Sequence, residues 1–116
     1  MKKFFFGLLL LTFVLTMIPA QQNPSITIVN NTGFVVYYVY ISSTADPNWG
    51  PDRLDANQVL RNGDSFTMVL PHPVNVVNRY DIRLVDLDGD SYIKWDHPVT
   101  ANARIVFNFN DIVWDY

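Results

Sequence analysis

The stretch that most constrains the fold is residues 79–97, which read as two β-strands joined by a tight turn. Asp88-Gly89 lies at the centre, and Asp-Gly tolerates the positive φ angles that a two-residue hairpin turn requires. Side chains alternate along a strand, so a turn centred there places the main apolar residues on one face: Ile82, Leu84, Ile93 and Trp95. We therefore predict a hairpin in which Trp95 is buried beside Ile82.

Composition favours β-structure for the rest of the chain. All eleven acidic residues are aspartate and none is glutamate, and aspartate favours turns whereas glutamate favours helices. Valine, isoleucine, tyrosine, phenylalanine and threonine are frequent, and these residues suit strands. The chain has no cysteine, so a small domain of this kind must be stabilised by packing without disulfides.

Alternating or uniformly apolar segments predict further strands on both sides of the hairpin: residues 25–30, 34–42, 65–70 and 103–110, with a short seventh strand at 59–60. The spacing of the turns is typical of an all-β, antiparallel two-sheet β-sandwich of six to seven strands, and a small β-barrel is the alternative. We expect residues 34–42 in the middle of a sheet, because so apolar a strand would promote aggregation at an edge. In the loop at residues 43–57, we expect Trp49 and Leu54 to cap one end of the core.

The first twenty residues have the features of a secretory signal peptide. Lys2-Lys3 precede an apolar run over residues 4–18, and Pro19-Ala20 precede a polar Gln-Gln. Cleavage after Ala20 would leave one β-sandwich domain, residues 21–116, exported to the periplasm or the extracellular space. The alternative is an uncleaved membrane anchor, but the apolar run is short for a full span and no basic stop-transfer group follows it. We expect no membrane insertion after cleavage.

The charge of the predicted mature domain argues against a nucleic-acid partner. Without Lys2 and Lys3, six of the eight Lys and Arg residues remain against eleven Asp, a formal balance of −5. Proteins that bind nucleic acids usually show a basic stripe, and this sequence has none. Anionic membrane surfaces are disfavoured for the same reason. The remaining partner classes are a protein, a surface ligand or a second copy of the chain.

The sequence offers little for catalysis. It has no cysteine and no Gly-x-Ser-x-Gly motif, and both His72 and His97 are followed by proline. The two histidines have no zinc-site spacing either. A small hydrolase that uses aspartates as general acid and base is an alternative, although no pair of aspartates stands out. We therefore expect a protein that is not an enzyme.

Asp86, Asp88 and Asp90 form the clearest candidate metal site. Three carboxylates within five residues could collect around Ca²⁺, which takes six to eight oxygen ligands. In a regular two-residue hairpin, however, the three side chains would point in different directions. We therefore expect no cofactor other than weakly bound calcium.

Residues 34–41 are apolar on both faces, although a sandwich strand needs only one apolar face. We expect the β-branched set to face the core together with Tyr37, which leaves an outward aromatic ridge as a candidate interaction surface: Phe34, Val36, Tyr38 and Tyr40. The alternative is that Trp114 and Tyr116 of the tail fold back and cover this ridge. An uncovered ridge would mark a contact with a partner.

Several short motifs resemble those of a group of small exported bacterial β-domains of unassigned function. They comprise Asn30-Asn31-Thr32-Gly33, residues 49–54 with the pattern Trp-Gly-x-Asp-x-Leu, and residues 86–90 with the pattern Asp-x-Asp-Gly-Asp. The resemblance implies export and a β fold, and it implies no catalytic residue. We expect an exported, non-catalytic interaction module; a calcium-dependent binding domain is the first alternative.

Overall fold

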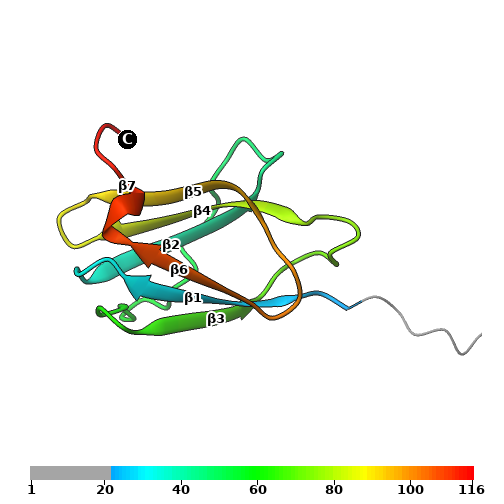
Figure 1. Cartoon of the computed structure of the whole chain (residues 1–116), viewed down its shortest axis with the longest axis horizontal. Coiled ribbons are helices and arrows are strands. Elements are labelled where there is room, and N and C mark those ends of the chain that lie inside the picture. The colour runs from blue at the N-terminus through cyan, green and yellow to red at the C-terminus, as the bar shows by residue number, and fades with distance from the viewer. Residues whose placement is uncertain (1–21) are drawn as a thin grey trace, which may run out of the picture.

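A computed structural model describes residues 22–116, so the predicted signal peptide lies outside the described residues (Figure 1). These residues form seven strands and one short 3-10 helix: β1 (Ser25–Asn31), β2 (Val36–Ser43), β3 (Ser65–Val69), β4 (Arg79–Asp86), β5 (Ser91–Pro98), β6 (Ala103–Asn108), η1 (Phe109–Asp111) and β7 (Ile112–Val113). No helix within residues 22–116 is long and apolar enough to cross a membrane.

The strands form two separate sheets, with the orders β3-β1-β6 and β2-β4-β5-β7. The predicted all-β sandwich is therefore confirmed, and the two sheets do not join into the alternative barrel. All pairings are antiparallel except that of β1 with β6, which is parallel. The order of the strands brings β1 and β6, which are far apart in the sequence, side by side in the smaller sheet (Figure 1).

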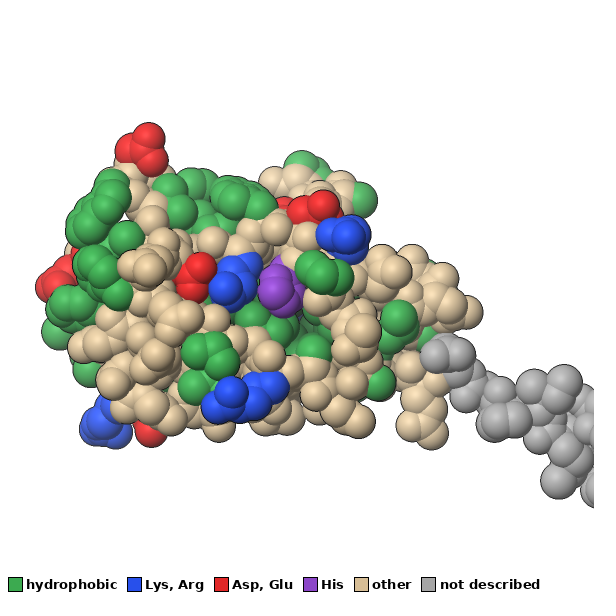
Figure 2. Space-filling model, in the orientation of Figure 1, with side chains coloured by type: hydrophobic (Ala, Val, Ile, Leu, Met, Phe, Trp, Pro, Cys, Tyr) green, Lys and Arg blue, Asp and Glu red, His purple; other side chains and the backbone are tan. Residues whose placement is uncertain are grey.

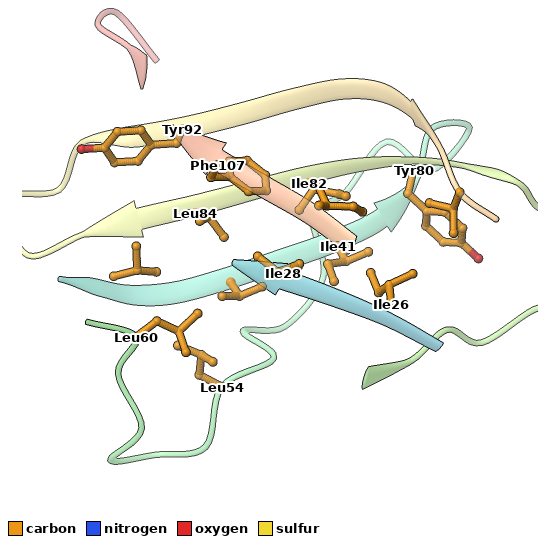
Figure 3. Packing of buried hydrophobic residues seen from close by; sticks show 14 of the residues in the cluster. Ile26, Ile28, Ile41, Leu54, Leu60, Tyr80, Ile82, Leu84, Tyr92 and Phe107 are labelled. Carbon is orange, nitrogen blue, oxygen red and sulfur yellow. The ribbon is translucent and has the colours of Figure 1, made fainter. Parts of the chain in front are cut away.

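Side chains from both sheets meet in one hydrophobic core. Ile28 of β1, Phe107 of β6 and Leu84 of β4 are completely buried. Figure 3 shows Tyr92 and Tyr80 near opposite ends of this cluster, with the Tyr80 hydroxyl pointing away from the other labelled side chains. Leu54 of the long loop is also buried, as predicted, whereas Trp49 of the same loop is only half-buried and lies outside the core cluster.

The hairpin between β4 and β5 exists, but the predicted register is wrong by one residue. Gly89 has φ +83° and Asp88 does not have a positive φ, so the turn is not the two-residue type. The Gly89 amide instead donates to the Asp86 carbonyl and the Asp86 amide donates to the Asp90 carbonyl, both at 3.0 Å. This is a type I turn followed by a glycine bulge, with a three-residue loop. Leu84 therefore pairs with Tyr92, and Ile82 pairs with Lys94.

The shifted register exchanges the two faces of β5. Tyr92 is fully buried in the core, whereas 56% of Trp95 is exposed. Trp95 therefore does not lie buried beside Ile82. A second bulge adds one residue to β5 opposite Asp81. At this bulge Asp96 has φ +49°, and its amide donates to the Asp81 carboxylate at 2.8 Å.

A bulge also alters the expected faces of β2. Val36 pairs with Asp86 and Tyr38 pairs with Val85, so Tyr37 is an extra residue in β2. The bulge lets Val36 and Val39 both point into the core, where both are fully buried. Tyr37 is 40% exposed, so the prediction that it faces the core is wrong.

Strand β2 lies at the edge of its sheet and not in the middle as predicted. The long loop covers this edge with backbone hydrogen bonds: the Arg53 amide donates to the Val39 carbonyl at 2.8 Å, and Val36 and Leu60 exchange two bonds at 2.8 and 2.9 Å. Leu60 thus forms a single bridge with Val36 in place of the predicted strand at 59–60. A covered edge does not offer the free N–H and C=O groups that promote aggregation.

Two of the short sequence motifs, those around Asn30 and Asp52, have structural roles. Asn30 is buried, and its side-chain amide donates to the Phe34 and Leu60 carbonyls at 2.8 and 2.9 Å. Asp52 accepts hydrogen bonds from the amides of Val39 and Leu54 at 2.9 and 3.1 Å. These polar side chains fix the turn after β1 and attach the long loop to β2.

Candidate functional site

The acidic hairpin tip is built around a buried carboxylate. Asp86 is 3% exposed, and its Oδ1 accepts hydrogen bonds from the amides of Asp88 and Asp90 at 2.9 and 3.0 Å. Its Oδ2 accepts from the Tyr92 hydroxyl at 2.8 Å. Burial, and then the hydrogen bond and charge of Asp86, hold the pKa of Tyr92 well above its ordinary value, so this phenol stays a donor. Asp86 therefore stabilises the turn.

The predicted divergence of the three aspartates is wrong. Oxygen atoms of Asp86, Asp88 and Asp90 all lie within 4.8 Å of one another, because the glycine bulge turns the tip back over the end of β4. Asp88 is exposed and Asp90 is half-buried. The tip therefore gathers three carboxylates, although both oxygens of Asp86 already accept hydrogen bonds from the protein.

The predicted ridge is not one surface. Val36 is completely buried, so its assignment to an interaction surface is wrong; the bulge at Tyr37 is the cause. Phe34 is 44% exposed, but its ring lies 6.1 Å from that of Phe109, beside η1. Tyr38 and Tyr40 do point outward, and their rings stack at 6.3 Å. The ridge thus reduces to these two tyrosines.

A larger aromatic cluster continues from Tyr40 across the outer side of the four-stranded sheet. The Trp49 ring lies 5.5 Å from that of Trp95, and the Tyr116 ring lies 6.1 Å from that of Trp95. The Arg83 guanidinium lies over the Tyr116 and Tyr40 rings, at 4.6 and 5.5 Å from their centroids. We call this surface the aromatic face; it comprises Tyr38, Tyr40, Trp49, Arg83, Trp95 and Tyr116.

Sequence reasoning missed four members of the aromatic face for identifiable reasons. The predicted hairpin register wrongly places Trp95 in the core, and Arg83 on β4 lies over the rings of Tyr40 and Tyr116. The sequence predicts that Trp49 caps the core, although a tryptophan between Asn48 and Gly50 is equally consistent with a surface loop. Tyr116 of the tail folds back onto Trp49, Trp95 and Arg83 rather than over the predicted ridge. Trp114 packs against Phe109 and is 73% exposed.

Two adjoining cavities flank Trp49, and both are also lined by Ser42 and Asp46. The larger, of about 200 Å³, extends to Arg53 and Tyr80. The smaller cavity has a volume of about 150 Å³ and is also lined by Asp81. Four further residues of the loop and the aromatic face complete its wall: Pro47, Asn48, Trp95 and Tyr116. The aromatic face therefore borders concave surface that contains carboxylate, amide and hydroxyl groups.

The two histidines lie apart from the acidic tip. His72 is exposed and lines the larger cavity, while His97 is half-buried on β5 and pairs with Tyr80. Within residues 22–116, neither belongs to a group of three potential metal ligands. On the face of the molecule in Figure 2, basic side chains lie apart from one another and form no continuous stripe.

Comparisons with known proteins support the fold alone. No protein-family model matches the chain, and no curated protein matches it. Among solved structures, the chain is similar to an NMR structure of a protein from Eubacterium rectale, with a TM-score of 0.55 and 17% sequence identity. The similarity covers 78% of this chain and 84% of that chain. This likeness agrees with the sandwich architecture and assigns no activity.

Proposed function

We propose that the protein is an exported, non-catalytic binding module that contacts its partner through the aromatic face. The observation that carries this proposal is the exposure of large rings on the side of the sheet that the core does not use: 56% of Trp95 and 54% of Tyr116 are accessible. Tyrosine, tryptophan and arginine are the residue types enriched at binding surfaces. Ring-to-ring and ring-to-guanidinium contacts hold these side chains in place before a partner arrives, which lowers the entropy cost of binding.

The roles of the nearby aspartates favour binding over catalysis. Asp46 accepts a hydrogen bond from the Asn48 amide at 3.0 Å, and Asp81 accepts bonds from Thr44 and from the Asp96 amide. These contacts stabilise a turn and a bulge. Because Asp46 and Asp81 also line the same cavity, an aspartate-dependent hydrolase is the competing interpretation. Activity assays on any ligand that binds will distinguish the two.

The binding proposal can be tested by NMR with ¹⁵N-labelled protein and cell-envelope material separated into protein and polysaccharide fractions. The three indole N–H signals, assigned by single tryptophan-to-phenylalanine substitutions, report on separate places. We expect one fraction to shift the signals of Trp49 and Trp95 and to leave that of Trp114 unchanged. A concentration-dependent shift of the same two signals in the protein alone would identify a second copy as the partner. If these signals respond in none of these experiments, the proposal is wrong.

Export rests on the sequence of residues 1–20 and has its own test. We expect the protein recovered from the periplasm or the medium to have an intact mass corresponding to a chain that begins at Gln21. A full-length chain retained in the membrane fraction would contradict export by cleavage.

The gathering of Asp86, Asp88 and Asp90 favours calcium binding as a second candidate function. Since both Asp86 oxygens already accept hydrogen bonds, we expect weak affinity, on the order of 10⁻⁴–10⁻³ M. A ligand that binds only the folded state raises the melting temperature. Millimolar Ca²⁺ should therefore raise it by a few degrees, and Asp88→Asn should remove the effect. Micromolar affinity by calorimetry, or an unchanged melting temperature, would contradict this expectation.

A further inference from the structure

Two residues that line the larger cavity carry buried hydrogen-bonding groups that the fold does not use. Tyr80 is 1% exposed and lines this cavity, and its hydroxyl has no hydrogen-bond partner in the described part of the chain. The same holds for Nε of Arg53, although another nitrogen of that guanidinium donates to the Ile41 carbonyl at 2.9 Å. Buried polar groups in folded proteins are nearly always paired. The two donors therefore point to an acceptor that enters the cavity from outside.

The nature of Tyr80 and Arg53 limits what this acceptor can be. Burial raises the pKa of the Tyr80 hydroxyl, so it remains protonated and able to donate. The Arg53 Nε–H is a donor only. A suitable ligand thus presents oxygen acceptors to this end of the site, and Asp46 in the same wall can accept hydrogen bonds from hydroxyl groups of the ligand.

The smaller cavity supplies an aromatic platform. The Trp49 and Trp95 rings are tilted by 38° and contact each other, so no ligand can be enclosed between them. The exposed ring surface can instead support one flat, apolar side of a ligand. Around it lie Asp46, Asp81 and Asn48, which offer both acceptors and a donor at the edge of the platform.

Charge argues against an ionic ligand. The Arg83 guanidinium already lies over the rings of Tyr116 and Tyr40, which disfavours a second cation there. Asp46 and Asp81 in the wall disfavour an anion. The guanidinium groups of Arg53 and Arg83 offset the attraction of these carboxylates for a cation. The remaining class is a neutral ligand with an apolar side and many hydroxyl groups, and a pyranose ring has both: C–H groups on its faces and hydroxyl groups around its edge.

We propose that the two cavities beside Trp49 form a binding groove for a neutral polysaccharide. One sugar ring stacks on Trp95, and a neighbouring ring enters the larger cavity, where a small shift of the cavity wall brings its oxygens within reach of the buried donors Tyr80 Oη and Arg53 Nε. The volumes, about 150 and 200 Å³, suit one sugar ring each. This inference rests on the proposed binding function and specifies the ligand of the same surface.

Two binding assays on the full protein test the inference. Affinity electrophoresis uses soluble glycans: laminarin, xyloglucan, galactomannan and glycogen. Pull-down assays use insoluble ones: cellulose, chitin and purified cell-wall sacculi. We expect at least one of these glycans to bind. Trp95→Ala should weaken binding at least about tenfold, since stacked aromatic anchors dominate such surfaces. Trp114→Ala, at an exposed tryptophan outside the groove, is the matched control and should bind like the unmodified protein.

Tyr80→Phe provides a second variant that keeps the fold. It removes only a hydroxyl that has no partner in the protein, so the melting temperature should stay the same or rise slightly. Glycan binding should nevertheless weaken about three- to tenfold, because the ligand loses a donor. A structural role for this hydroxyl would instead lower the melting temperature and leave the affinity of the folded protein unchanged, and that result would overturn the inference.

The remaining outcomes separate this inference from the proposed function. If no glycan binds but a protein fraction shifts the Trp49 and Trp95 signals, the saccharide inference is wrong and the binding module stands. If neither glycans nor proteins affect these signals, both are wrong. Release of reducing sugar ends from a bound glycan, lost in Asp81→Asn, would show a hydrolase and overturn the non-catalytic assignment.

Discussion

Both faces of the four-stranded sheet carry large apolar side chains, but the surroundings of the two faces differ. On the inner face, Ile82, Leu84 and Tyr92 are completely buried. On the outer face, Tyr38 and Trp95 remain 44% and 56% exposed, even though both are large and apolar. Hydrophobicity alone therefore does not decide which face becomes the core. Backbone bulges at Tyr37 and Gly89 decide it, because each added residue changes the face to which the following side chains point.

The sharpest contrast between the faces is expected for two aromatic residues of β5. Tyr92→Ala should lower the free energy of unfolding by about 3–5 kcal/mol, because it leaves a cavity in the core. Trp95→Ala should cost only about 1 kcal/mol, the value of its ring contacts. Urea denaturation of both variants measures this difference. Equal losses would mean that Trp95 belongs to the core and that the observed register is wrong.

The next contrast lies at the hairpin tip. Asp86→Ala removes the acceptor for two amides and leaves the Tyr92 hydroxyl unpaired, so we expect a loss of about 2–4 kcal/mol. Asp88→Ala, at an exposed position, is the control and should cost about 0.5 kcal/mol. Thermal unfolding followed by circular dichroism compares them. A tolerated Asp86→Ala would show that the buried carboxylate does not stabilise the turn.

Strand β2 allows the same comparison between inner and outer side chains within five residues. Val36→Ala should cost about 2 kcal/mol because Val36 is fully buried. The double substitution Tyr38→Ser with Tyr40→Ser should cost about 1 kcal/mol, chiefly through lost ring stacking and strand preference. Chemical denaturation of the two variants provides the measurement. If the double substitution unfolds the domain, the outer tyrosines are part of the core.

The smallest expected effect concerns pH. Burial, and then the charges of Lys94 and Arg79, lower the pKa of His97 below 6.5 in the folded protein. The unfolded chain therefore binds a proton first as the pH falls, and stability should decline from about pH 6.5 down to the lower folded pKa and then level off. His97→Gln should flatten this part of the stability profile. His72→Gln, at an exposed site, is the control and should leave this part of the stability profile unchanged. If His72→Gln flattens the profile, the slope does not come from His97.

The strand segments were readable from the sequence because each depends on local alternation of apolar and polar residues. All six longer strands lie within a few residues of the predicted ranges, and the two-sheet architecture followed from them. The register of the hairpin was not readable in the same way. Asp88-Gly89 suits both a two-residue turn and a three-residue loop with a glycine bulge, and the choice depends on the three hydrogen bonds to the Asp86 side chain.

The candidate site was less accessible to sequence reasoning than the fold. The aromatic face joins Trp49 from a loop, Arg83 and Trp95 from neighbouring strands, and Tyr116 from the tail. Nothing in their spacing marks them as neighbours, since long-range packing brings them together. The unpartnered hydroxyl of Tyr80 is also invisible in the sequence, where Tyr80 reads as one more apolar residue of a strand.

The segment that covers the edge of β2 has a consequence for the lifetime of the folded protein. Arg53 and Leu60 shield the hydrogen-bonding edge of β2, and Trp49, only four residues before Arg53, forms part of the groove. Opening of this segment would therefore disrupt the groove and, at the same time, expose the unpaired N–H and C=O groups at the edge of β2. A glycan held against Trp49 would oppose that opening, so occupancy of the groove would also protect the β2 edge from pairing with another chain.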